Sequence, residues 1–98
     1  MIIDDYIKYQ NKYVKQFGKK TVVLLEVGSF FEYYGIDTVD YQWGNIKDVA
    51  NVLDAIVSRK SKKISHSRKN PLMAGFPNHA IQKHLDKLIK NGWTVVLI

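Results

Sequence analysis

The sequence predicts a mixed α/β domain, in which a small mixed sheet of roughly five to six strands is flanked by about three helices. Two observations predict this fold class. Apolar residues recur at helical spacing in residues 3–17, 46–56 and 81–89. Between these stretches lie short runs of β-branched and aromatic residues, bounded by glycine, proline or asparagine, which are typical of strands. Residues 1–98 are predicted to form one domain, because a chain of this length buries a single modest core.

The first third of the chain predicts one helix and two strands. The helix covers residues 3–17 and ends at Gly18, a residue that commonly follows a helix C-terminus. Residues 21–27 are mostly β-branched residues and leucine, which predicts a strand covered on both faces. A Gly-Ser turn then leads into a second predicted strand over residues 30–34.

The middle of the chain predicts a second helix and two more strands. Asn45 is expected to cap this helix at its N-terminus. The apolar face of the helix is predicted to consist of Ile46, Val49, Ala50, Leu53 and Ile56. A short strand is expected near Ile56 and Val57, and another at residues 71–77, between two prolines.

The end of the chain predicts a third helix and a last strand. Asn78 is expected to cap the helix, which closes at Asn91 and Gly92. Its apolar face is predicted to consist of Ile81, Leu85, Leu88 and Ile89. Residues 93–98 are predicted to return as a strand. Because the chain stops within this strand, we expect it to be a domain excised from a longer protein.

Positive charge is concentrated in one segment. The chain carries a net charge of +6, and residues 59–69 contain no acid. The basic residues of this segment are Arg59, Lys60, Lys62, Lys63, Arg68 and Lys69. Such a cationic loop is typical of contact with a polyanion such as the backbone of a nucleic acid. The alternative is a solvated, mobile loop, which is the usual explanation of a charge run.

Several classes of function are not expected. The absence of cysteine excludes disulfides and thiolate zinc sites. No apolar run approaches the roughly 18 residues that span a bilayer, and no signal-peptide pattern is present, so no membrane partner is expected. His66, His79 and His84 fit no metal-binding pattern. No nucleophile, base and acid lie at motif spacing, so no enzymatic activity is expected within these residues.

The stretch after the first predicted strand combines aromatic rings with one acid. In an extended strand, Phe30 and Glu32 share one face about 7 Å apart, while Phe31 and Tyr33 point to the other. One face is therefore expected to pack in the core, and the other to present an aromatic ring beside a carboxylate. The alternative is that Phe30 completes the core and Glu32 is an ordinary exposed acid.

Three motifs follow one another along the chain. They consist of Gly28, Ser29, Phe30, Phe31 and Glu32; of Leu53, Asp54, Ser58, Arg59 and Lys60; and of Met73, Ala74, Gly75, Phe76, Pro77, His79 and Ala80. In this order they resemble the N-terminal mismatch-recognition domain of the MutS family of DNA mismatch-repair proteins. The likeness extends over nearly the whole chain. Three motifs in the right order are more specific than the Phe-x-Glu pattern alone.

The sequence also departs from the family pattern. Ser29 stands where the family usually has aspartate, Asn78 where it has tyrosine, and Leu72 is inserted before Met73. Residues 36–43 follow no pattern of the family. These departures leave the two central residues of the first motif in place.

The resemblance implies a function and a set of partners. It implies that Phe30 wedges beside a mispaired base from the minor groove and that Glu32 hydrogen-bonds to that base. The implied partner is double-stranded DNA with a mismatch or small loop, whose phosphates the cationic loop would contact. The implied parent protein is a homodimer that uses ATP and magnesium in domains outside this one, and this domain itself needs no cofactor.

Two other classes of function remain open. One is a structural or protein-interaction domain of a MutS-like protein that does not recognise lesions. The other is a small nucleic-acid enzyme, which would need clustered metal-binding carboxylates, whereas the acidic residues of this chain are scattered.

Overall fold

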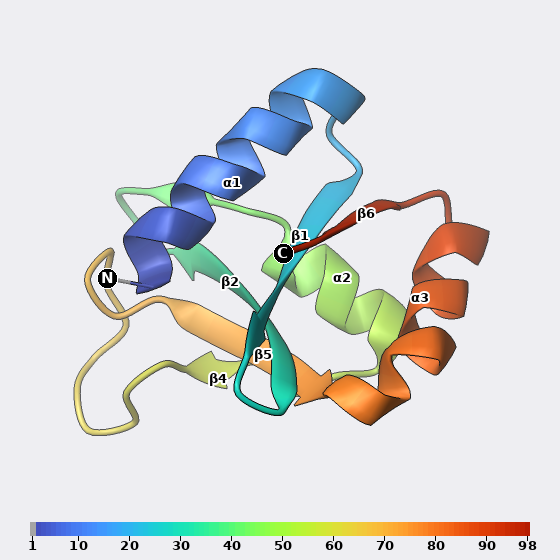
Figure 1. The fold of residues 1–98 in the computed structure, drawn as a ribbon. Coiled ribbons are helices and arrows are strands. Elements are labelled where there is room, and N and C mark those ends of the chain that lie inside the picture. Colours follow the sequence, from blue (N-terminus) through green and yellow to red (C-terminus); the bar gives the residue numbers. More distant parts are fainter. Residues whose placement is uncertain (1) are drawn as a thin grey trace.

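The computed structural model describes residues 2–98, which form a mixed α/β domain as predicted. Its elements are α1 (Ile2–Phe17), β1 (Thr21–Val27), β2 (Phe30–Asp37), β3 (Gln42–Trp43), α2 (Ile46–Leu53), β4 (Ser58–Arg59), β5 (Leu72–Pro77), the short 3-10 helix η1 (Asn78–Ala80), α3 (Ile81–Lys90) and β6 (Thr94–Leu97). The six strands form one sheet in the order β4-β5-β2-β1-β6, with β3 paired to β2 (Figure 1). Only β1 and β6 are parallel in this sheet.

The helices cover both faces of the sheet. On β2, the ring of Tyr34 meets the ring of Tyr6 from α1, whereas the next residue, Gly35, lies against Ile46 of α2. Because successive residues of a strand point to opposite faces, α1 and α2 lie on opposite sides of the sheet. Helix α3 packs beside α2 (Figure 1). This arrangement explains why the first four residues of β1 are all buried, as the apolar run predicted.

Three elements between residues 30 and 59 differ from their predicted bounds, and one turn explains two of these differences. Helix α2 ends at Leu53 because Asp54 adopts a left-handed backbone with φ 54°, which breaks the helical hydrogen-bonding pattern. Ile56 therefore leaves the apolar face of the helix and is 89% exposed. The short strand that follows is shifted from its predicted position and forms at Ser58–Arg59. Strand β2 is longer than predicted and continues to Asp37.

Two predicted caps do not form. Asn45 occupies the N-cap position of α2, but its side-chain amide donates to the carbonyl oxygens of Lys19 and Thr21 and so ties α2 to the start of β1. The side chain of Asn78 donates to Glu26 Oε2 (3.1 Å), and the regular helix begins later, at Ile81. In α3, Leu88 is buried as predicted.

Other predicted positions of α3 and β6 differ in part from the structure. Ile89 is 58% exposed, so it does not belong to the buried face of α3. The last strand begins at Thr94, one residue after its predicted start. Within residues 2–98, no helix is long and apolar enough to span a bilayer.

Polar side chains of α1 take the place of strand pairing along the N-terminal half of β1. Pairing with β2 covers Leu25–Val27 of this strand, so the earlier residues need other partners on that side. Gln10 of α1 is buried and supplies them: its amide nitrogen donates to Thr21 O (2.7 Å), and its oxygen accepts from Val23 N (2.8 Å). Tyr6 donates its hydroxyl to Val23 O (2.8 Å), and burial raises the pKa of this tyrosine. These bonds fix α1 over the sheet.

Candidate nucleic-acid interface

The turn between β1 and β2 places Phe30 at the end of the sheet. Gly28 adopts φ +60°, a backbone conformation that favours glycine, and Phe30 then pairs with Val27 on one side and with Pro77 on the other. The side chain of Phe30 is 46% exposed. Phe30 therefore does not complete the core, and the alternative that it does is wrong.

The two faces of β2 differ as the alternation of residues predicted. Phe31 and Tyr33 are buried, and the ring of Phe31 packs 5.9 Å from that of Phe76. Phe30 and Glu32 lie on the opposite face, where they line a shallow cavity of about 310 Å³ together with Met73, Ala74 and Gly75. The cavity thus combines an exposed aromatic ring, a carboxylate and apolar walls.

Glu32 has a protein partner that the sequence reasoning missed. The hydroxyl of Tyr34 donates a hydrogen bond to Glu32 Oε1. Burial, the hydrogen bond to Glu32 and the charge of that residue all raise the pKa of Tyr34, so its hydroxyl keeps its proton at neutral pH. The available signal was the spacing, since a tyrosine two residues after the glutamate shares its face of the strand.

Gly75 keeps the cavity open. It pairs directly with Glu32 across the strands β2 and β5. A Cβ atom at this position would lie 2.5 Å from the carbonyl oxygen of Phe31 and 3.4 Å from Glu32 Cγ. Any larger residue would therefore push strands β2 and β5 apart at the cavity wall, which gives the glycine of the third motif a physical reason.

The cationic loop, residues 59–69, is folded around one buried amide. Asn70 is 2% exposed, and its side-chain nitrogen lies within hydrogen-bond distance of the carbonyl oxygens of Ser61, Ile64 and Ser65. Its side-chain oxygen accepts from Ser61 N (2.8 Å). These contacts hold both ends of the loop together. The six basic side chains stay exposed, as both phosphate contact and the alternative, a solvated loop, require.

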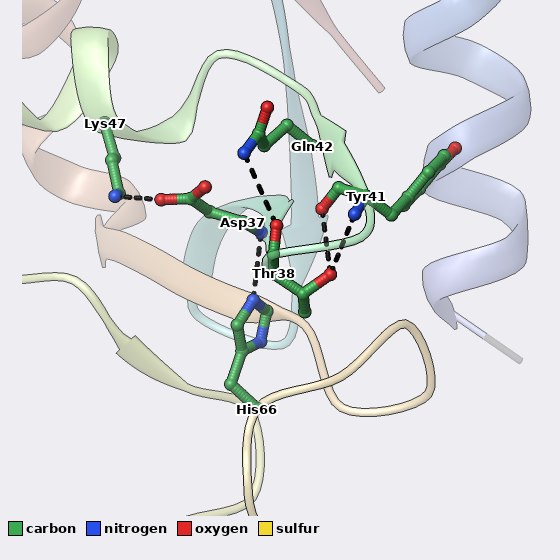
Figure 2. A network of polar contacts seen from close by, with 6 residues as sticks. All are labelled: Asp37, Thr38, Tyr41, Gln42, Lys47 and His66. Atoms are coloured by element: carbon green, nitrogen blue, oxygen red, sulfur yellow. Dashed lines mark hydrogen bonds and ion pairs between the residues drawn. The ribbon is translucent and has the colours of Figure 1, made fainter.

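His66 connects the cationic loop to the end of β2. Its Nε2 accepts from the backbone N–H of Asp37 (2.9 Å; Figure 2). Its Nδ1 lies 2.9 Å from the carbonyl oxygen of Asn70. Both contacts are satisfied by a neutral imidazole with its proton on Nδ1. The Asp37 carboxylate in turn pairs with Lys47 of α2, and this ammonium lowers the pKa of Asp37.

The predicted phosphate-binding residues differ in their surroundings. Lys60 Nζ lies 5.4 Å from the centre of the Tyr34 ring, and Arg68 stacks over the ring of Tyr41 at 4.3 Å. Arg59 donates to the carbonyl oxygen of Lys62 (3.0 Å). Lys62, Lys63 and Lys69 are exposed. Because the Tyr34 ring belongs to the face of Phe30 and Glu32, the structure brings Lys60 to that same face.

Other candidate chemistry has no geometric basis in the described residues. Among residues 2–98, no group of three or more histidine, aspartate or glutamate side chains is placed to hold a metal ion. His84 instead packs on Phe76, with ring centres 4.1 Å apart, and burial lowers its pKa.

Comparison with known proteins identifies the family of this fold and site. The sequence model of MutS domain I matches residues 7–98. The chain therefore belongs to the MutS domain I family, as the three motifs predicted.

Individual relatives agree with this assignment. A mutS homologue of Acanthamoeba polyphaga mimivirus, named as a DNA mismatch repair protein, is 32% identical over an alignment of 94 positions, which covers 94% of this chain and 8% of that protein. The DNA mismatch repair protein MutS of Chlorobium limicola is 32% identical over 76 residues, 78% of this chain and 7% of that protein. The mitochondrial DNA mismatch repair protein mutS homologue of Sarcophyton glaucum is 26% identical over an alignment of 109 positions, which covers 95% of this chain and 11% of that protein. The chain thus spans about a tenth of the length of these relatives.

Proposed function

We propose that this chain is the mismatch-recognition module of a MutS-like protein and binds double-stranded DNA that contains a mispair or a small loop. The observation that carries the proposal is the exposed ring of Phe30 beside the Glu32 carboxylate, at a cavity on the uncovered end of the sheet. Membership of the MutS domain I family supports it, as do the names of the relatives, which are DNA mismatch repair proteins.

Phe30 is proposed to act as the wedge. Inserting an apolar side chain between base pairs unstacks one step, at a cost of a few kcal/mol, and bends the duplex. A mispaired step is already poorly stacked and more easily deformed, so the same insertion costs less there. Strand pairing on both sides holds the backbone of Phe30 in place, which gives the half-exposed ring a rigid support.

Glu32 is proposed to make the site selective. A carboxylate that approaches DNA and loses water is penalised unless it finds a hydrogen-bond donor. A displaced base can offer an N–H group that a Watson–Crick pair keeps occupied. Glu32 therefore disfavours matched DNA more than it disfavours a lesion, and discrimination arises from this difference.

The cationic loop is proposed to hold the domain on the duplex without regard to sequence. Phosphate contacts of this kind fix position, while contacts to bases select. Lys60 is best placed for this role, because it lies on the face of Phe30 and Glu32. If about four of the six basic side chains meet phosphates, the logarithm of affinity falls with the logarithm of salt concentration at a slope of roughly −3 to −4.

A titration with two fluorescent duplexes tests the proposal. One duplex is fully matched, the other carries one mismatch, and binding is measured by anisotropy at two salt concentrations. We expect weak binding that favours the mismatch and falls steeply with salt, because a single module buries little surface. Absence of binding at low salt would instead support a structural or protein-interaction domain, and metal-dependent cleavage a nucleic-acid enzyme.

Replacing the carboxylate by its amide tests the role of Glu32. For Glu32→Gln we expect equal or tighter binding to matched DNA and a smaller preference for the mismatch, because the charge that penalises matched DNA is gone. Glu26→Gln is the matched control: it makes the same change in net charge at an exposed position of β1 outside the cavity. A clear loss of affinity for matched DNA in Glu32→Gln, with Glu26→Gln unchanged, would contradict the proposed penalty.

The proposal assigns no reaction to these residues. The homodimeric clamp and the use of ATP and magnesium are proposed for the parent protein alone, through domains other than this one. In that arrangement the domain contributes lesion recognition, and the second half of the clamp raises the affinity by holding the duplex at two places.

A further inference from the structure

The hydrogen bond between Tyr34 and Glu32 makes the two oxygens of the carboxylate different from each other. Oε1 accepts from the Tyr34 hydroxyl. Within residues 2–98, Oε2 accepts no hydrogen bond from the protein, and the Glu32 side chain lines the cavity next to Phe30. One oxygen is thus held by the protein and the other is left for a ligand.

Tyr34 is itself held firmly. Its side chain is 1% exposed, and its ring meets the Tyr6 ring edge-on at 5.1 Å. Tyr6 is in turn anchored by its hydroxyl to Val23 O (2.8 Å). The backbone of Tyr34 pairs with Met73 of the neighbouring strand β5, and Met73 lines the cavity together with Phe30 and Glu32. The tyrosine hydroxyl therefore has a fixed position from which to orient the carboxylate.

We propose that Tyr34 is the positioning residue for Glu32: its hydroxyl binds Oε1 and directs Oε2 toward the cavity as the acceptor for an N–H group of a displaced base. This inference rests on the proposed function, because it presupposes that the cavity receives a base. Because Oε2 acts as an acceptor, the site binds bases through their N–H donors, such as N3–H of an unpaired thymine.

The chain offers a matched control one residue away. Tyr33 is also buried, but its hydroxyl has no hydrogen-bond partner among residues 2–98. Tyr33→Phe and Tyr34→Phe thus remove the same atom from adjacent buried tyrosines, and only Tyr34→Phe removes a bond to Glu32.

The test measures mismatch preference as the ratio of dissociation constants for a matched duplex and for the same duplex with one unpaired thymine. We expect Tyr34→Phe to lower this ratio by about threefold to tenfold, the effect of one lost hydrogen bond, while affinity for matched DNA stays within about twofold. Tyr33→Phe should leave the ratio unchanged. In a Glu32→Ala background, Tyr34→Phe should have no further effect, because a residue that acts through Glu32 has nothing left to position.

A measurement without DNA separates positioning from loss of fold. With carbon-13 at the glutamate carboxyl groups, the Glu32 resonance should shift in Tyr34→Phe and stay in place in Tyr33→Phe, while thermal unfolding shows that both variants are folded. An unshifted Glu32 resonance in folded Tyr34→Phe would overturn the inference.

The two proposals fail in different ways. If the wild-type chain shows no preference for the unpaired thymine, the proposed function falls and the role of Tyr34 falls with it. If the preference exists and depends on Phe30, but Tyr34→Phe retains it or lowers it equally with and without the Glu32 side chain, only the role of Tyr34 is overturned.

Discussion

Phe30→Ala is expected to abolish the preference for mismatched DNA, leaving affinities for matched and mismatched duplexes within about twofold of each other while weak binding persists. The reason is that inserting the Phe30 ring costs less free energy where the base step is poorly stacked, so the preference for a mismatch depends on this ring. The phosphate contacts of the cationic loop do not depend on stacking and are retained. Fluorescence anisotropy with both duplexes, in this chain and in a full-length background, measures the effect.

Phe17→Ala is the matched control for this variant. Phe17 is 51% exposed against 46% for Phe30, but it lies at the end of α1 and outside the cavity. Both substitutions remove a half-exposed phenyl ring, so each should cost only about 1 kcal/mol of stability. An unchanged mismatch preference in Phe30→Ala, or an equal loss in Phe17→Ala, would refute the wedge assignment.

Asn70→Ala is expected to lower the free energy of unfolding by about 2–4 kcal/mol, because it removes a buried amide that serves several backbone groups of the cationic loop. The groups left without their partner are the carbonyl oxygens of Ser61, Ile64 and Ser65 and the backbone N–H of Ser61. Urea denaturation measures the loss. The loosened loop should also reduce the magnitude of the salt slope of DNA binding by about 1.

Two further variants sharpen this prediction. Asn70→Asp keeps an acceptor for Ser61 N but loses the donors, and should also destabilise the domain strongly. Asn51→Ala changes an exposed asparagine on α2 and should cost less than about 0.5 kcal/mol. If Asn70→Ala unfolds at the same urea concentration as Asn51→Ala, the loop does not depend on this amide.

Local sequence patterns predicted correctly those features that involve residues close together in the chain or that follow a strict period. The alternation along β2 predicted that Phe30 and Glu32 share a face opposite Phe31 and Tyr33. The cavity that Phe30 and Glu32 line together, away from the buried Phe31 and Tyr33, confirms it. The same patterns failed at the end of α2, where one left-handed residue, Asp54, ends the helix early. They also failed at Asn45 and Asn78, whose side chains bond to β1 instead of capping their helices.

The sequence predicted which residues form the candidate site, but it did not predict the side-chain contacts between them. The motif identifies Phe30 and Glu32, and the run of charge identifies the cationic loop. The bond from Tyr34 to Glu32, the approach of Lys60 to the Tyr34 ring and the role of Asn70 as the centre of the loop appear only in three dimensions. Asn70 was missed because an asparagine beside a proline looks like an ordinary turn residue.

Residue order was enough to predict the fold class, the family, the alternation that sets Phe30 beside Glu32, and the place of the positive charge. These properties follow from residue order, from period and from composition. Three further properties are seen only once the chain is folded: the Phe30 ring is exposed, a tyrosine hydroxyl holds one oxygen of Glu32, and the cationic loop folds around a buried amide. The physical reason is that exposure and hydrogen-bond partners depend on which distant segments pack together, and a local pattern does not specify that packing.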